Sequence, residues 1–208
     1  MKKTEFQKYE VGRIAVDAVV LTVKDDSFWV YLNTREKDPY QGLAELPGGL
    51  LFPDETAETT LLRKVTDAIG LTNVAIQQFH TFTEPNRDPR IRTISIAYLA
   101  LLPAEQVKQW DCFQDLHELP KLAFDHQDII TQAREYIKQN ATDLLAKQLL
   151  PEYFPLNQAQ VVYQLMQGEV MDNRNFRKKI LASGVVEKAS LKQKNVTHRP
   201  ATLFKFVI

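Results

Sequence analysis

The sequence predicts an α+β protein with two domains, residues 1–138 and residues 139–208. Three observations lead to this prediction. The first part combines β-prone runs with a capped helix, the second part changes at Ala141 to short helices and a final β-hairpin, and the net charge changes sign. Residues 1–150 hold 17 Lys and Arg against 22 Asp and Glu, and residues 151–208 hold 9 against 4, so the net charges are −5 and +5. This asymmetry favours a basic nucleic-acid-binding module, and the alternative is an ordinary solvated basic surface.

The composition is that of a globular protein that buries a core, with 44% hydrophobic and 25% charged residues. Cys112 is the single cysteine, which excludes an intramolecular disulfide and suits a reducing cytoplasm. The basic residues at the start are not followed by an apolar segment, so we expect no signal peptide. No window approaches the ~18 apolar residues of a membrane helix. We therefore expect a cytoplasmic protein with no membrane partner.

The first domain is expected to begin with a β-hairpin. Residues 11–23 are mostly Val, Ile, Ala and Leu, and residues 28–33 alternate large apolar and polar side chains. Asp25 and Asp26 mark the turn between these two strands. A loop rich in charged and turn-forming residues follows at 35–42.

A helix is expected after the Pro-Gly-Gly break at 47–49. Asp54 can cap its N-terminus, Leu61 and Val65 are apolar positions along it, and Gly70 can end it. The rest of this domain is predicted as strands near residues 74–83 and 91–102 around a polar loop, an irregular connection at 104–124, and a helix over residues 128–139.

The second domain has the element order of a winged helix-turn-helix. Asn157 is expected to cap one helix and Asp172 the next. Two β-prone runs, 185–187 and 202–207, then flank a polar basic loop at 188–200. Helix, short turn, helix and β-hairpin is the order found in small DNA-binding domains of the winged type.

The motif of the first domain consists of residues at fixed spacing. Five residues separate Gly49 from Glu55, seven separate Glu55 from Arg63, and a Gly-Leu pair follows at 70–71. This frame resembles the Nudix box, and the segment 43–71 resembles a Nudix loop–helix–loop. The resemblance implies that the first domain is a Nudix α/β/α sandwich with a mixed sheet. It also implies that Glu55 and Arg63 mainly brace the loop.

The residues at the acidic positions of the box argue against catalysis. A Nudix hydrolase needs carboxylates on one helical face, because Mg²⁺ takes oxygen ligands and bridges pyrophosphate oxygens. Those positions hold Lys64, Asp67 and Ala68. We therefore expect no enzyme activity, no metal and no required cofactor. The alternative is that Glu58 or another acid substitutes, leaving a Mg²⁺-dependent ADP-ribose or nucleoside-diphosphate pyrophosphatase.

A pocket without catalysis can still bind a nucleotide. Residues 15–23 and 87–101 are similar to the ADP-ribose-directed branch of the Nudix superfamily, which implies ADP-ribose or a related nucleotide as effector. Arginine can donate two parallel hydrogen bonds to the oxygens of a diphosphate. The candidate ligand-binding residues, each of which is alternatively an ordinary surface charge, are Arg35, Arg87, Arg90 and Arg92.

The second domain also resembles a known family, so the resemblance covers nearly the whole chain. Residues 150–187 and 198–206 are similar to the C-terminal domain of the Nudix-related transcriptional regulators of the NrtR type. The resemblance implies a repressor of NAD metabolism genes with ADP-ribose as effector. Relatives with the same architecture control sugar catabolism, so a sugar or sugar phosphate is the alternative effector.

The residues of the second domain support DNA binding in their own right. If Phe176, Ile180 and Leu181 face inward, the 100° helical step turns basic and amide side chains outward. Arg and Asn read base edges in the major groove, and Lys neutralises phosphates. We expect a homodimer on a palindromic operator in double-stranded DNA. The candidate DNA-binding residues are Arg174, Asn175, Lys178 and Lys179 on the helix, and Thr197, His198 and Arg199 in the wing.

Overall fold

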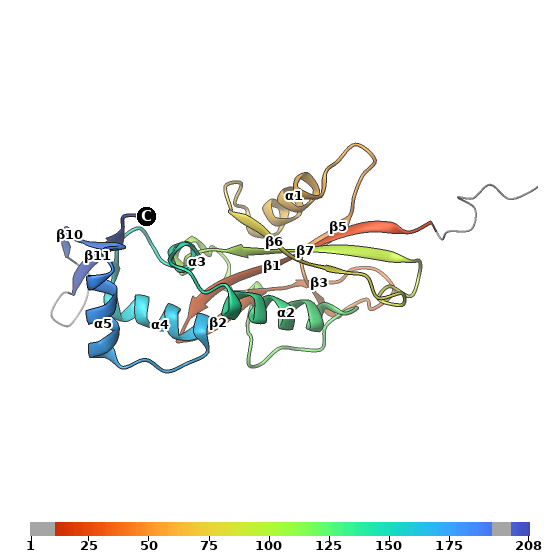
Figure 1. Ribbon diagram of the computed structural model, residues 1–208. Helices are drawn as coiled ribbons and strands as arrows, with labels where there is room; N and C mark the ends of the chain where they lie inside the picture. The colour runs from red at the N-terminus through yellow and green to blue at the C-terminus, as the bar shows by residue number, and fades with distance from the viewer. Residues whose placement is uncertain (1–10, 193–200) are drawn as a thin grey trace, which may run out of the picture.

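The computed structural model describes residues 11–192 and 201–208. A mixed sheet lies between helices, and a smaller head with its own sheet lies at one end of it (Figure 1). The strands are β1 (Arg13–Lys24), β2 (Ser27–Tyr31), β3 (Asn33–Thr34), β4 (Ala44–Glu45), β5 (Gly48–Leu50), β6 (Ile76–Phe82), β7 (Thr93–Leu101), β8 (Phe113–Asp115), β9 (Phe154–Pro155), β10 (Val186–Lys192) and β11 (Thr202–Phe206). The α-helices are α1 (Ala57–Ile69), α2 (His126–Gln139), α3 (Asp143–Leu149), α4 (Leu156–Gln167) and α5 (Asn173–Ala182).

The large sheet has six strands in the order β6-β7-β1-β2-β8, and β5 also pairs with β1. β1 runs parallel to β7 and antiparallel to β2 and β5, so the sheet is mixed, as predicted. β8 is a correction, because residues 104–124 were predicted to be irregular and Phe113 pairs with Tyr31 of β2. A strand of three residues with one buried apolar side chain is too short to produce a periodic pattern.

Both faces of the sheet are covered, which explains why eight of the twelve residues of β1 are apolar. Val16 and Val20 pack with Leu61 of α1 in one apolar cluster. Val19 and Leu21 belong to a second cluster with the buried residues of α2. Alternate residues of a strand face opposite sides of a sheet, so the two clusters mark its two faces. The predicted α/β/α sandwich is confirmed.

The N-terminus of α1 differs from the prediction. Thr56, and not Asp54, is the N-cap, and its hydroxyl accepts a hydrogen bond from the N–H of Thr59 at 3.2 Å. The backbone of Thr56 is extended (φ −79°, ψ 166°), which is the conformation that an N-cap requires. Gly70 ends the helix in the left-handed conformation (φ 68°), as predicted.

The head follows the order helix, strand, helix, helix, hairpin, and its strands pair in the order β10-β11-β9. The winged helix-turn-helix order is therefore present. The prediction that Asn157 caps a helix is wrong, because α4 begins one residue earlier and Pro155 is its N-cap. The prediction for Asp172 is confirmed, since its Oδ1 accepts from the N–H of Asn175 at 2.9 Å.

The sheet region and the head share one apolar core. The cluster that contains Leu21 and Ile130 of α2 continues through Leu149 of α3 to Val162 and Met166 of α4. α3 contacts both β7 and α4, so it lies between the two regions. The predicted boundary after residue 138 falls at the end of α2 and stays a prediction. Within the described residues, no helix has both the length and the apolar character to cross a membrane.

Candidate functional site

Glu55 and Arg63 form the central ion pair of the loop before α1. Two nitrogens of Arg63 donate to the two carboxylate oxygens of Glu55, at 2.9 and 2.7 Å. The Thr60 hydroxyl also donates to Glu55 at 2.7 Å. The hydrogen bonds from Arg63, followed by that from Thr60, lower the pKa of Glu55 from 4.5 to about 2. This arrangement ties the loop to the helix and agrees with a bracing role.

The face of α1 that carries metal ligands in a Nudix box has a different character here. The Cε atom of Lys64 lies 3.0 Å, and its Nζ atom 3.6 Å, from the point where a Cβ would stand on Gly49. Asp67 is exposed, and Ala68 packs against the apolar cluster on the α1 face of the sheet. Glu58 accepts a hydrogen bond from the Tyr98 hydroxyl at 3.3 Å.

These residues do not fit a magnesium site of the Nudix kind. Nowhere in residues 11–192 and 201–208 do three or more His, Cys, Asp or Glu side chains gather in a group that could hold a metal ion. An ammonium group also repels a dication, and Lys64 stands where a ligand would be needed. The chemistry of the donor set therefore favours binding of an anion over binding of Mg²⁺.

A small cavity of about 120 Å³ lies between β5, the β6–β7 loop and the start of α2. Asp17 is 6% exposed at its edge and accepts from the Ser95 hydroxyl at 2.5 Å. A Cβ on Gly48 would lie 2.4 Å from Asp17 Oδ1, so only glycine lets β5 approach β1 this closely. The cavity is lined by Ala15, Asp17, Arg35, Glu45, Leu46, Gly48, Gly49, Leu50, Arg87, Asp88, Arg90, Thr93, Phe124 and His126.

His126 closes the inner end of this cavity. It is 4% exposed, and its Nδ1 accepts from the backbone N–H of Leu46 at 2.9 Å. The ring proton is therefore on Nε2, which lies 3.6 Å from Asp17 Oδ1. His126 is the first residue of α2, so the cavity and the start of that helix are built together.

Three of the four predicted ligand-binding arginines line the cavity, and each already faces a carboxylate. Arg87 donates to both oxygens of Asp125, at 2.8 and 2.6 Å, and its side chain is only 5% exposed. Arg90 donates to both oxygens of Asp88, at 2.9 and 2.7 Å, and these hydrogen bonds lower the pKa of Asp88. The third pair joins Arg35 to Glu45 at 2.7 Å.

Arg92 is not part of the cavity. Its Nη1 donates to the backbone carbonyl of Thr83 at 2.6 Å at the exposed surface. The sequence analysis missed Phe124, whose ring lies 4.6 Å from the guanidinium carbon of Arg35 and 5.4 Å from that of Arg90. It also missed His126 and the carboxylate partners. No local motif indicates the partner of Arg87, because Arg87 and Asp125 are 38 residues apart.

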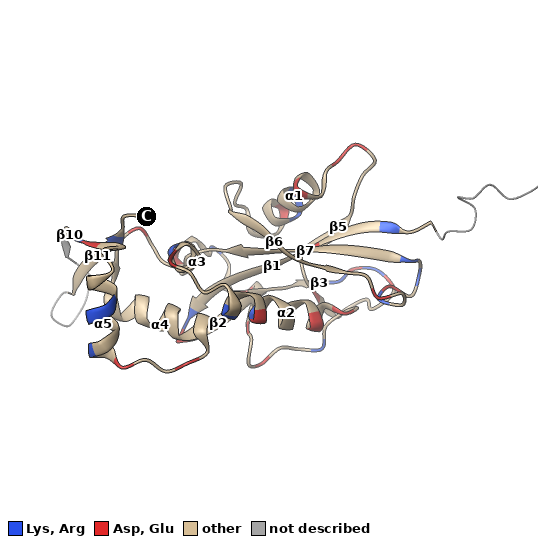
Figure 2. Ribbon diagram, in the orientation of Figure 1, with Lys and Arg blue, Asp and Glu red and all other residues tan. Residues whose placement is uncertain are grey.

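The exposed face of α5 carries most of the predicted DNA-binding residues (Figure 2). Phe176 and Ile180 are 8% and 6% exposed and hold the helix to the head. Leu181 is a correction, because it was predicted to face inward and is 49% exposed. At 100° per residue, Arg174 and Lys178 point away from the two buried residues.

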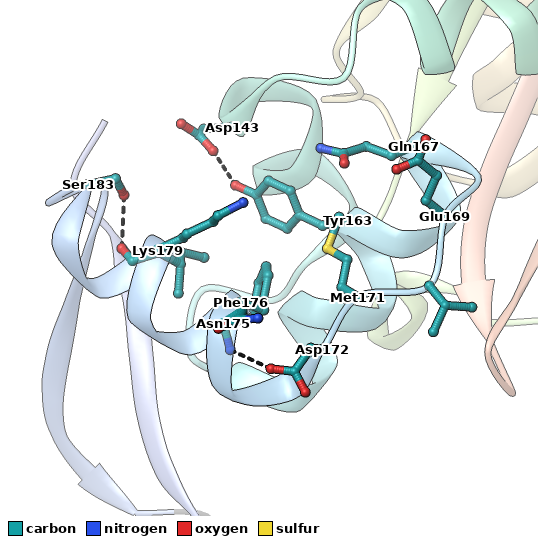
Figure 3. Close-up of a pocket in the computed structure, with 12 residues that line it drawn as sticks. Asp143, Tyr163, Gln167, Glu169, Met171, Asp172, Asn175, Phe176, Lys179 and Ser183 are labelled. Carbon is teal, nitrogen blue, oxygen red and sulfur yellow. Dashed lines mark hydrogen bonds between the residues drawn. The ribbon is translucent and has the colours of Figure 1, made fainter.

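The other predicted DNA-binding residues are Asn175 and Lys179 on α5 and the three residues of the wing. Asn175 is exposed and donates its N–H to the Asp172 cap. Lys179 is exposed but extends along the side of α5 toward Tyr163 of α4 (Figure 3). Arg177, which the sequence analysis omitted, is an exposed cation on the same helix. The wing residues Thr197, His198 and Arg199 lie outside the described residues.

Comparison with known families divides the chain in the same way. The NUDIX domain model matches residues 12–145, and the model of the NrtR DNA-binding winged helix domain matches residues 146–206. The two matches meet within α3, which lies between the sheet region and the head.

The known proteins that resemble the chain include a repressor, a DNA-bound regulator and a pyrophosphatase. The ADPR responsive transcriptional repressor NtrR of Acinetobacter baylyi is 27% identical over 98% of this chain and 86% of its own length. The crystal structure of Shewanella oneidensis NrtR with a 27mer DNA is 30% identical with a TM-score of 0.80, and 93% of each chain is covered. The Nudix domain of that protein with ADP ribose is 31% identical with a TM-score of 0.52, covering 64% of this chain and 93% of that one. The ADP-ribose pyrophosphatase of Methanocaldococcus jannaschii is 33% identical over 62% of this chain and 79% of its own.

Proposed function

The chain belongs to the Nudix family and carries the NrtR-type DNA-binding winged helix, and we therefore propose that it is an ADP-ribose-responsive transcriptional repressor. The observation that carries the proposal is the combination of two sites in one chain. An arginine-lined cavity lies in the Nudix domain, and a helix with exposed basic residues lies in the head. The likeness to a DNA-bound regulator covers both parts.

DNA binding is assigned to the outward face of α5. Arg174 can read a guanine edge with two hydrogen bonds, and Lys178 and Arg177 can neutralise phosphates. Residues 151–208 carry a formal charge of +5, which supports attraction to a duplex. A homodimer on a palindromic operator is the arrangement that helix-turn-helix proteins commonly use, and we include it in the proposal.

The effector site is assigned to the cavity beside β5. The arginines of the cavity already have carboxylate partners. A diphosphate must therefore displace one of those carboxylates from its arginine, or bind a cation that has no such partner. Lys64 meets this need, because no ion pair of its ammonium with any described residue is present and it stands over Gly49. The cavity of about 120 Å³ encloses only one part of a nucleotide of this size, so the rest lies over the rim.

The absence of hydrolysis is part of the proposal, and a pyrophosphatase is the second candidate function. The 33% identity to the M. jannaschii enzyme favours that candidate. The residues Lys64, Asp67 and Ala68 at the acidic positions of the box argue against it. Incubation of the protein with ADP-ribose and Mg²⁺ distinguishes the two, since release of AMP at ordinary enzymatic rates would establish the enzyme.

The regulated genes and the effector can be tested together. We propose genes of NAD metabolism, with sugar catabolism and a sugar or sugar phosphate effector as the alternative. A thermal-shift series with ADP-ribose, NAD and pentose phosphates separates these effectors, because a ligand that prefers the folded state raises the melting temperature. Stabilisation by pentose phosphates alone would replace ADP-ribose in the proposal.

The decisive experiment is a mobility shift with DNA from upstream of the neighbouring operon, with and without ADP-ribose. We expect a specific complex that ADP-ribose weakens. Arg174→Ala should reduce specific affinity by about 1–3 kcal/mol if the side chain reads a base. The matched control is Arg134→Ala, which removes an exposed arginine of α2. Equal DNA affinity of the wild type and Arg174→Ala would exclude α5 as the recognition helix in this form.

A further inference from the structure

A cavity of about 460 Å³ lies inside the head and is separate from the Nudix cavity (Figure 3). It is enclosed by the start of α3, the C-terminal part of α4, the loop 168–172 and one side of α5. Its volume falls within the range of ordinary small-molecule sites, about 300–1,000 Å³. The Nudix cavity is smaller, so the head holds the roomier of these two spaces.

The inner wall of this head cavity is apolar and aromatic. Phe176 and Ile180 line it from α5, and the ring of Tyr163 lies 5.5 Å from the ring of Phe176 at 55°. Met171 adds a polarisable thioether, and Val170 stands at the mouth with 95% of its surface exposed. A ligand with an apolar body would cover Val170 and contact both rings.

The charged groups of the lining are unbalanced. Asp143, Glu169 and Asp172 contribute three carboxylates, and Lys179 contributes one ammonium. Asp143 accepts a hydrogen bond from the Tyr163 hydroxyl, and burial followed by this hydrogen bond raises the pKa of Tyr163, so the phenol stays neutral.

The carboxylates differ in how far the protein already uses them. Asp172 is occupied as the cap of α5. Glu169 makes no side-chain hydrogen bond or ion pair with any residue in the described part of the chain. The mouth therefore presents the carboxylate of Glu169, and the whole lining holds three carboxylates against one ammonium, which favours a cationic ligand over an anionic one.

We propose that this head cavity is a second ligand site, which binds a small organic cation with an apolar or aromatic body. The ammonium group of the ligand lies beside Glu169 at the mouth, and its body covers Val170 and Met171 and reaches the exposed edges of Tyr163 and Phe176. Lys179 lies on the other side of Tyr163 from Glu169 (Figure 3). The site is independent of the Nudix cavity and of the proposed response to ADP-ribose.

The test uses three probes of nearly equal size and different charge: phenethylamine, 2-phenylethanol and phenylacetate. We expect phenethylamine to stabilise the full chain in thermal-shift and calorimetric titrations. The neutral probe should bind about 2- to 5-fold more weakly, as expected for loss of an ion pair near the surface, and the anionic probe more weakly still. Hydrogen exchange should slow in α4 and α5 when phenethylamine is present, and not around the Nudix cavity.

Two variants locate the site. Glu169→Gln should weaken phenethylamine about 2- to 5-fold, because its carboxylate is exposed. Asp143→Asn should weaken it less, by about 2-fold at most, because Asp143 is already paired with Tyr163 and the amide oxygen still accepts from that hydroxyl. Glu135→Gln on α2 is the matched control and should leave affinity unchanged.

The Glu169 side chain has no hydrogen bond or ion pair with a described residue to lose, so its variant remains informative if Asp143→Asn fails to fold. No binding of phenethylamine, equal binding of all three probes, or equal effects of the Glu169 and Glu135 variants would each overturn the proposal.

Discussion

Replacement of Lys64 by methionine tests the proposal that its ammonium group binds the phosphates of ADP-ribose in the Nudix domain. Met keeps the length and the apolar stem of the side chain and removes the ammonium group that lies over Gly49. A hydrogen bond to a charged group contributes about 1.5–3 kcal/mol when buried. Lys64 is half-buried, so the lower part of that range applies, and ADP-ribose affinity should fall about 10-fold.

Calorimetric titration with ADP-ribose, AMP and adenosine measures this effect and assigns it to the phosphates. The loss caused by Lys64→Met should be largest for ADP-ribose and absent for adenosine, which has no phosphate. Lys108→Met is the matched control, because Lys108 lies near the far end of α1, beside Gly70. Unchanged affinity for ADP-ribose, or an equal loss in the Lys108 variant, would refute the assignment of Lys64.

Three further predictions concern the head and the fold. Lys178→Ala should reduce the slope of log affinity for DNA against log salt concentration by about 1. Lys179→Ala should leave this slope nearly unchanged, because the Lys179 side chain extends toward Tyr163. Mobility shifts at several salt concentrations measure both slopes. The pKa of Glu55 is about 2 in the folded protein and 4.5 ordinarily, so its ionised form contributes stability that is complete above pH 4.5 and is lost as the pH falls toward 2. Thermal melts should therefore show that Glu55→Gln unfolds at lower temperature at neutral pH and depends less on pH in this acid range. Phe154 is 0% exposed and packs against Phe206 at 5.1 Å, so Phe154→Ala should cost about 3–5 kcal/mol in urea unfolding; a loss below about 1 kcal/mol would show that the head does not depend on this contact.

The layers of the fold could be predicted because long apolar runs carry a strong periodic signal. The starts of α1 and α4 could not, although Gly70 at the end of α1 and Asp172 at the start of α5 were predicted correctly. Asp54 and Thr56 are both good N-caps by type, and the extended backbone at Thr56 decides between them. The prediction for Asn157 was wrong for a related reason. Pro155 already holds the extended backbone conformation of the N-cap, so α4 begins before Asn157.

The arginines of the site could be predicted by residue type, and their partners could not. Pairing of Arg87 with Asp125 depends on how the β6–β7 loop folds back over the start of α2, which no local pattern encodes. The pair of Arg90 with Asp88 is local, yet a short loop with both charges reads equally well as a solvated surface. Ion pairs of this kind decide which cations remain available to an anion.

The start of α2 connects the Nudix cavity to the head. Asp125 and His126 stand at its first turn and contact the cavity residues Arg87 and Asp17. The buried face of the same helix packs with α4, and α4 carries α5. An anion that takes Arg87 from Asp125 changes the contacts of the helix on which α4 rests, and packed helices respond to such changes by shifting as units. A ligand that leaves that ion pair intact lacks this route to the recognition helix, so the Arg87–Asp125 pair is where effector binding and movement of the head would be joined.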